Sequence, residues 1–292
     1  MATPTMLLLL ADGRFPAGAH AHSAGLEAAV AAGRVTDLAT LGEYLRGRLA
    51  TAGLVAAAFT AAACRAAGHG AAGAATVSRA AGSARAGEVA SPDERESAGP
   101  VGVGPDVVGS DGVGLNGVGP HGVGLRASLP ADGAARRRKA LARLDAELDA
   151  RTASPAQRAV SRRQGRALLR AGRRIWPEAT FDDLPAIPGG PHQPLVLGLV
   201  GAAAGLDPGQ VATVAAHATV TGSASAAVRL LGLDPYQVQG LLVRLAAACD
   251  ATATRAARAA EDPPERLPAA AAPLADMHAE AHATWEVRLF AS

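Results

Sequence analysis

The stretch Asp234-Pro-Tyr-Gln-Val-Gln-Gly-Leu-Leu-Val-Arg-Leu245 decides the fold class of this chain. Asp234 is a favourable N-cap residue, and Pro235 suits the first helical position because it lacks an N–H that would go unpaired there. Apolar side chains then recur three and four residues apart, at Val238, Leu241 and Leu245, which is the spacing of one helix face. The stretch therefore predicts an amphipathic helix whose apolar face packs into a core.

The same helix-start pattern occurs twice more, at Ser154-Pro-Ala-Gln157 and Asp207-Pro-Gly-Gln210. In each, an oxygen-bearing cap precedes proline, and a glutamine three residues after the cap can reach back to the cap's own N–H. Nearer the N-terminus, Thr36 or Asp37 can cap a helix in which leucines repeat from Leu38 to Leu49. Aromatic residues make up only 3% of the chain, which disfavours a β-rich core. We predict an all-α fold, a single helical-bundle domain.

The chain divides into four parts. Residues 1–67 and 134–262 are predicted to be the two halves of the helical domain. Residues 68–133 contain five glycine-valine near-repeats, from Val101 to Leu125, and glycine at that density makes ordering costly. We therefore predict a flexible, disordered insertion within one domain. Residues 263–292 form a proline-rich approach and a tail, which we expect to be loosely held until a short helix around Ala275–Val287.

Charge and cysteine usage point to a soluble cytoplasmic protein. The net charge of +2 gives no strong attraction to nucleic acid or to a membrane surface. Cys64 and Cys249 are isolated, which fits a reducing compartment. The arginine clusters Arg136–Lys139, Arg162-Arg163 and Arg173-Arg174 alternate with leucines, so we expect them on the solvent side of amphipathic helices.

Few residues suggest chemistry. His20 and His22 could present two imidazoles to a metal, but the sequence nearby supplies no convincing third and fourth ligand. His278 and His282 share a helix face without the glutamate of a zinc-hydrolase motif, and we expect that face to be solvated. We recognise no Ser-His-Asp set, assign no catalytic residue, and predict that the chain is not an enzyme. Two alternatives stay open: a helical nucleic-acid-binding regulator, and a metal-dependent enzyme that uses these histidines.

Four blocks of sequence carry a family pattern in a fixed order. The first runs from Phe15 to Glu27, and the second is Ser161-Arg-Arg-Gln-Gly-Arg-Ala-Leu-Leu-Arg170. The third includes Ser225-Ala-Ala-Val-Arg229, and the fourth is the tail up to Ser292. In this order they resemble the UreF family of urease accessory proteins, although Ala19, His20 and Ala283 depart from its pattern. The matching positions of the first and fourth blocks are Pro16, Gly18, Ser23, Gly25, Leu26, Glu27, Asp276, His282, Arg288, Leu289 and Phe290.

The resemblance implies a function without covalent chemistry. A protein of this kind is a helical homodimer that binds the UreD/UreH accessory protein and recruits the GTPase UreG. The assembly docks on apo-urease, and nickel is its cargo rather than a permanently bound cofactor. Phe15 and the matching residues of the first and fourth blocks are implied to contact partners, with Leu289 and Phe290 as buried anchors and Arg288 as a charged donor. The residues taken as structural are Gln164, Gly165, Arg166, Ser225 and Arg229.

Overall fold

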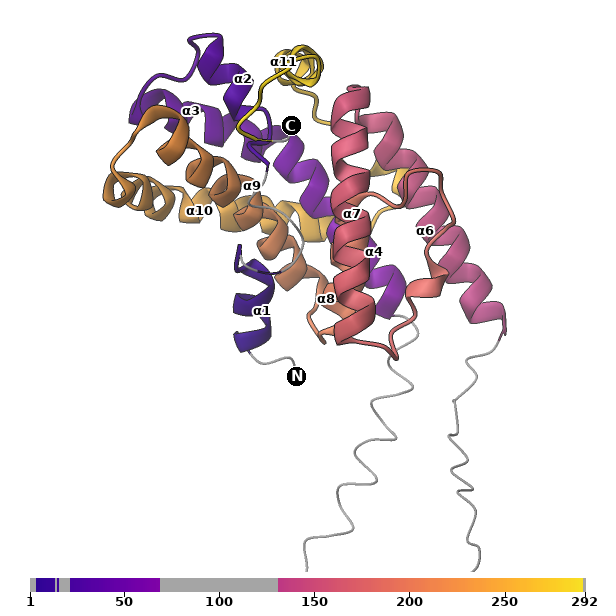
Figure 1. Ribbon diagram of the computed structural model, residues 1–292. Helices are drawn as coiled ribbons and strands as arrows, with labels where there is room; N and C mark the ends of the chain where they lie inside the picture. The colour runs from indigo at the N-terminus through magenta and orange to yellow at the C-terminus, as the bar shows by residue number, and fades with distance from the viewer. Residues whose placement is uncertain (1–3, 14, 16–21, 69–130, 291–292) are drawn as a thin grey trace, which may run out of the picture. The chain divides into compact units, whose positions relative to one another are not determined.

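The computed structural model describes residues 4–13, 15, 22–68 and 131–290, which form helices and the loops between them (Figure 1). All of them fall within one compact unit. The prediction of an all-α fold is confirmed for this part of the chain, whereas the predicted insertion lies almost wholly outside the described residues.

The helices are α1 (Pro4–Ala11), α2 (Leu26–Ala31), α3 (Leu38–Arg48), α4 (Leu54–Gly68), α6 (Ala131–Arg151), α7 (Pro155–Ile175), α8 (Gln193–Ala203), α9 (Pro208–Leu231), α10 (Pro235–Ala259) and α11 (Pro273–Ala283). Short helical turns lie at Leu49–Gly53, Phe181–Asp183 and Pro264–Arg266.

The caps expected at Asp37, Ser154, Asp207 and Asp234 are confirmed, whereas the returning glutamine bond that was predicted for three of these helix starts is seen only at α9 among the described helices. The side chains of Asp37, Ser154 and Asp207 each accept a hydrogen bond from the N–H three residues later, and Asp234 accepts one from Tyr236. At α9, the Gln210 side chain also returns a bond of 3.0 Å to the N–H of Asp207. These caps satisfy backbone donors that would otherwise be unpaired, so each helix begins at a defined residue.

The core is built from α4, α8, α9 and α10. Helices α4 and α9 pack against each other, and each of them also packs against α8 and α10. Phe59 of α4 is the largest fully buried side chain among the described residues. Two glycines allow α8 to approach its neighbours closely. A Cβ at Gly198 would lie 2.4 Å from the carbonyl oxygen of Thr60 on α4, and one at Gly201 would lie 2.1 Å from Val211 Cγ1 on α9. The alanine-rich composition thus supports close helix packing rather than large side-chain volume.

Two helical spans, Leu38–Gly68 and Pro208–Leu231, are long and apolar enough to cross a membrane. However, 67% and 56% of their most apolar windows are buried inside the protein. Core helices of soluble proteins pass the same test, so these spans are weak evidence for a membrane protein.

The arginine clusters are less uniform than predicted. Most of these side chains lie at the surface, but Arg137 is buried and its Nε donates to Asp183 Oδ2 at 2.6 Å. Arg162 is also largely enclosed and binds Asp145 at 3.1 Å and Asp149 at 2.6 Å. The prediction of a wholly solvated arginine face is therefore wrong at these two positions. Carboxylates buried on the facing surface supply the counter-charges that make this burial tolerable.

Candidate partner-binding site

The first family block turns the chain sharply into α2. Ala24 and Gly25 both adopt left-handed backbone conformations, with φ of 55° and 85°. The Ala24 carbonyl is held in place by two donors, Tyr44 Oη at 2.9 Å and Arg48 Nη1 at 2.7 Å. A side chain at Gly25 would be strained at this φ and would place its Cβ 3.5 Å from Tyr44 Oη. The turn explains why glycine is needed at this position.

Below this turn, Ser23 is fully buried and fixes the start of α2. Its hydroxyl oxygen accepts a hydrogen bond of 3.3 Å from the N–H of Glu27, and its carbonyl accepts one of 3.2 Å from Ser223 on α9. Ser23 is thus a buried link between the loop, α2 and α9. It is a structural residue in this conformation rather than an exposed contact.

Glu27 holds the C-terminal tail. Its Oε2 accepts from His282 Nε2 at 3.0 Å and from the N–H of Phe290 at 3.0 Å, while Oε1 accepts from the N–H of Leu289 at 2.9 Å. We call these four residues the Glu27 clamp. Burial by itself would raise the pKa of Glu27, but the hydrogen bonds from Leu289, His282 and Phe290 lower it below its ordinary value. The clamp therefore favours an ionised Glu27 at neutral pH.

The clamp corrects two expectations about the tail. His282 is fully buried beside Glu27 and against the Trp285 ring, so the prediction of a solvated face is wrong for this histidine. Phe290 is also buried, with the Arg229 guanidinium 5.9 Å from its ring centroid. The tail is consequently anchored in the structure rather than loosely held. Since Glu27 and His282 are 255 residues apart in the sequence, helical periodicity gave no signal of this contact.

A second attachment joins α11 to the start of α7. Glu280 accepts hydrogen bonds from the Ser154 hydroxyl and from the N–H of Ala156, the latter at 2.9 Å. Asp276 accepts from Gln157 Nε2 at 3.0 Å. A carboxylate at a helix N-terminus is favoured by the unpaired N–H groups and the helix dipole there. Glu280 and the clamp therefore hold α11 and the tail at two separate points.

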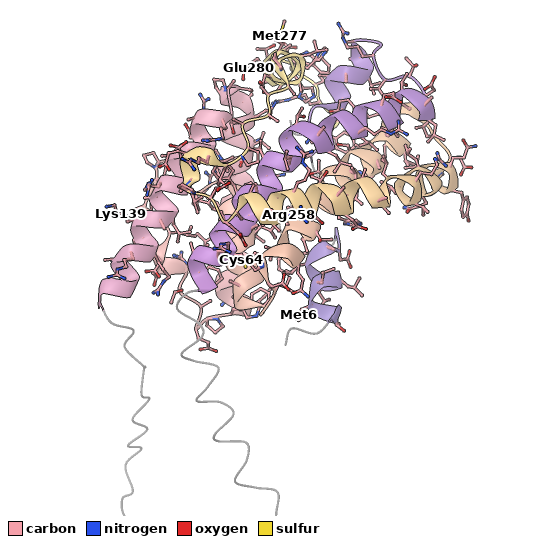
Figure 2. The ribbon with its side chains drawn as sticks, turned by 180° about the vertical axis from the view of Figure 1, so that it is seen from behind. Met6, Cys64, Lys139, Arg258, Met277 and Glu280 are labelled. Carbon is pink, nitrogen blue, oxygen red and sulfur yellow. The ribbon has the colours of Figure 1, made fainter. Side chains whose placement is uncertain are left out.

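The outer side of α11 and the tail exposes large apolar side chains. Leu274 and Met277 share one face of α11, with exposed fractions of 44% and 68%, and Figure 2 shows Met277 on this helix. In the tail, Val287 is 85% exposed and Leu289 is 73% exposed, and Arg288 between them is also exposed. We call Leu274, Met277, Val287 and Leu289 the tail surface. Exposed apolar side chains grouped on one segment are typical of protein-binding sites.

The adjacent residues Leu289 and Phe290 therefore have different surroundings. Phe290 is 6% exposed and packs against the chain's own core, whereas Leu289 projects outward while its N–H is bound by Glu27. In this conformation only Leu289 is available to a partner. The buried Phe290 and the clamp instead determine the direction in which Leu289 points.

The second family block lies where α7 meets the loop before α8. A Cβ at Gly165 would lie 2.1 Å from the carbonyl oxygen of Pro191, so this position requires glycine. Arg166 donates to the carbonyl of Gly189. Gln164 is half-buried in the same helix, and Ser225, from the third block, is exposed on α9. Gly165 and Arg166 thus both contact the loop before α8.

The structure also brings together Ser161, His192 and Asp149, a grouping that the sequence analysis did not find. The Ser161 hydroxyl lies 3.0 Å from His192 Nδ1, and His192 Nε2 lies 3.1 Å from Asp149 Oδ1. Burial lowers the pKa of His192 below its ordinary value, which favours the neutral form of its ring. Ser161 also accepts from the N–H of Gln193 at 3.3 Å, and Asp149 binds Arg162. All three side chains are thus engaged in fixing the start of α8 against α6 and α7.

The metal candidates do not gather into a site in the part of the chain that the structure describes. No group of three or more His, Cys, Asp or Glu side chains among these residues could hold a metal ion. His22 is half-buried near the turn into α2, and Phe15 packs partly against the core. His20, Pro16 and Gly18 lie outside the described residues.

Known proteins show the same pattern over the whole chain. The sequence model of the UreF family matches residues 122–246. The chain is 36% identical to the urease accessory protein UreF of Mycolicibacterium vanbaalenii and 38% identical to that of Mycobacterium sp. (strain JLS), over 100% of both proteins in each case. It is 33% identical to the urease accessory protein UreF of Mycobacterium tuberculosis (strain H37Rv), over 88% of this chain and 86% of the relative.

Proposed function

Because this chain belongs to the UreF family of urease accessory proteins, we propose that it is a non-catalytic assembly factor for nickel insertion into apo-urease. In this proposal it binds the UreD/UreH accessory protein and recruits the GTPase UreG as a cytoplasmic homodimer. Nickel is the cargo of the assembly, and this chain contributes binding surfaces rather than a chemical step.

The observation that best supports a docking role is the tail surface. Four large apolar side chains are exposed on α11 and the tail, although their backbone is fixed by the Glu27 clamp and by Glu280. An interface formed by a fixed segment loses less conformational entropy on binding than one formed by a free tail. We therefore propose the tail surface as the contact for UreD/UreH, with Leu289 as its apolar anchor and Arg288 as a charged donor at its edge.

The test is co-purification with UreD/UreH after changing only exposed residues. The double variant Val287→Asp, Leu289→Asp places two charges on the tail surface and leaves the buried Phe290 intact. We expect at least about a tenfold loss of affinity, because charges buried in an apolar interface are costly. The matched control is Val243→Asp, since Val243 is 75% exposed on α10 and lies outside the tail surface.

Urease activation provides the second measurement. We expect cells that carry the double variant to contain urease with little nickel and little activity, and cells that carry the control to resemble the wild type. Circular dichroism should show equal helix content in all three proteins. Full binding and full nickel loading with the double variant would remove the tail surface as the docking site.

A further inference from the structure

A cavity of about 300 Å³ lies beneath α11, between the turn into α2 and the helices α4, α7, α8 and α9. Its size falls at the lower end of the range found for small-molecule sites. Alanines and other small residues of α9 and α11 form much of its wall, while Gln164, Gln193 and Ser161 contribute polar groups. The space is therefore neither a purely apolar void nor a part of the tail surface.

Two arginines line this cavity, and they differ in how their charge is balanced. Arg151 pairs with Glu147 and also donates to the carbonyls of Pro264, Glu265 and Leu267. Its charge is thus compensated within the protein. Arg48 has no comparable partner, which makes it the unusual group of the cavity.

The guanidinium of Arg48 donates from Nη1 to the carbonyl of Ala24 at 2.7 Å. It also interacts with the Tyr44 hydroxyl and lies 6.0 Å from the centroid of the Tyr44 ring. It makes no ion pair with any described carboxylate, and its Nε, like that of Arg151, is buried without a hydrogen-bond partner. The two arginines thus differ in the ion pair that Arg151 makes with Glu147. A guanidinium carries five N–H donors and keeps its charge at all physiological pH values. Arg48 is only partly buried, and a partly buried cation with unused donors is stabilised when an anion or ordered water satisfies them.

Neutral donors from other helices of the lining could complete an anion site. Gln164 on α7 and Gln193 at the start of α8 both line the cavity, and their side-chain amides make no hydrogen bond to another described residue. Asp276 is the only acidic residue among the described residues of the lining, and its carboxylate accepts a hydrogen bond from Gln157. The described residues of the lining thus offer one positive charge without a carboxylate partner and two amides without a hydrogen bond to another described residue, which disfavours a cation and suits an oxyanion.

We propose that this cavity binds a small oxyanion, of the phosphate or carboxylate class, with Arg48 as its principal ligand and the amides of Gln164 and Gln193 as further donors. Arginine presents paired N–H groups to two oxygens of such an anion. The bound anion would balance Arg48 and join the turn into α2 to α7 and α8. This proposal is independent of the tail surface and of any partner protein.

The experiment is calorimetric titration of the full-length chain with inorganic phosphate, and separately with acetate, at an ionic strength held constant with sodium chloride. Melting temperature is recorded in parallel, because a ligand that binds only the folded state raises it. We expect saturable binding of at least one of the two anions. Substitution Arg48→Gln should weaken it at least about tenfold.

The matched control is Arg46→Gln, because Arg46 lies on the same helix, is exposed and pairs with Glu43 outside the cavity. We expect this variant to bind as the wild type does. If Arg48→Gln does not fold, Arg48→Lys serves instead and should bind measurably but more weakly, since lysine keeps the charge and loses the paired donors. The proposal is overturned if the wild type binds neither anion up to about 10 mM, or if loss of Arg46 weakens binding as much as loss of Arg48.

Discussion

Replacing Glu27 by glutamine removes the charge of the clamp and leaves its shape nearly unchanged. The oxygen of the glutamine side chain can replace only one of the two carboxylate oxygens. The amide nitrogen takes the place of the other oxygen and cannot accept, so the backbone N–H or the His282 Nε2 that donated there loses its acceptor. A hydrogen bond to a charged group contributes about 1.5–3 kcal/mol, and a buried donor left unpaired costs about 1–3 kcal/mol. We therefore expect the tail to be destabilised by about 2–4 kcal/mol relative to the core.

Hydrogen exchange measures this effect directly, because the amides of Leu289 and Phe290 are the donors to Glu27. A loss of about 2 kcal/mol or more corresponds to exchange at least about thirtyfold faster at these two positions. Amides of the central helices, such as that of Leu245, should exchange as in the wild type. The control is Glu43→Gln, since the Glu43 side chain is 78% exposed and pairs only with Arg46.

The pH dependence follows from the lowered pKa of Glu27. A carboxyl group whose pKa is lower in the folded protein adds stability that is fully present above its unfolded pKa of 4.5 and is lost as the pH falls through the folded value. Acid should therefore release the tail of the wild type, which the fluorescence of Trp285 beside His282 would report. Glu27→Gln should show no such transition. Equal exchange and equal acid behaviour in the two proteins would refute the clamp as the element that holds the tail.

Two further predictions concern the core. Gly165→Ala should lower the free energy of unfolding by more than about 2 kcal/mol, because its Cβ would collide with the carbonyl of Pro191. Gly222→Ala, which has open space around it, should be neutral or stabilising. Thermal denaturation compares the two variants, and equal melting temperatures would contradict the close contact at Gly165. Cys64 should resist thiol reagents at pH 8 until the protein unfolds, because burial, and to a lesser extent Asp207, raises the pKa of its thiol to about 12. Rapid labelling of Cys64 in the native protein, located by mass spectrometry, would contradict its burial.

Local sequence rules predicted the parts of the fold that depend on neighbouring residues. Ser154, Asp207 and Asp234 cap their helices because each cap bonds to an N–H only two or three residues away. Such contacts are encoded in a few consecutive positions, so one sequence is enough to find them. Gly25 is different, because the resemblance implied a partner contact there, whereas the structure shows a left-handed φ that requires glycine.

The side-chain contacts around the candidate site join residues that are far apart in the sequence, so rules based on neighbouring residues could not predict them. Ser161, His192 and Asp149 come from three segments and meet only because Gly165 lets the loop before α8 approach α7. The residues of the tail were found by resemblance, but their division into a buried Phe290 and an exposed Leu289 was not, because both are simply apolar in sequence. Periodicity identifies which side chains share a helix face, and it carries no information about what covers that face.

Arg137 and Arg162 show the physical reason for this limit. Helical spacing correctly placed both on the polar faces of α6 and α7, and a polar face is solvated unless another segment brings a matching charge. Asp183 and Asp145 bring that charge, and each is itself nearly inaccessible to solvent. Each of these charges is therefore tolerated in a buried position only because its partner is buried with it. The sequence does not show which residues form such a pair, because the two members come together only in the tertiary structure. Arg48 is the converse case, because its Nε is buried without a hydrogen-bond partner and no described carboxylate pairs with its guanidinium. The same reasoning that explains the burial of Arg137 thus identifies Arg48 as the position where a ligand from solution would complete the structure.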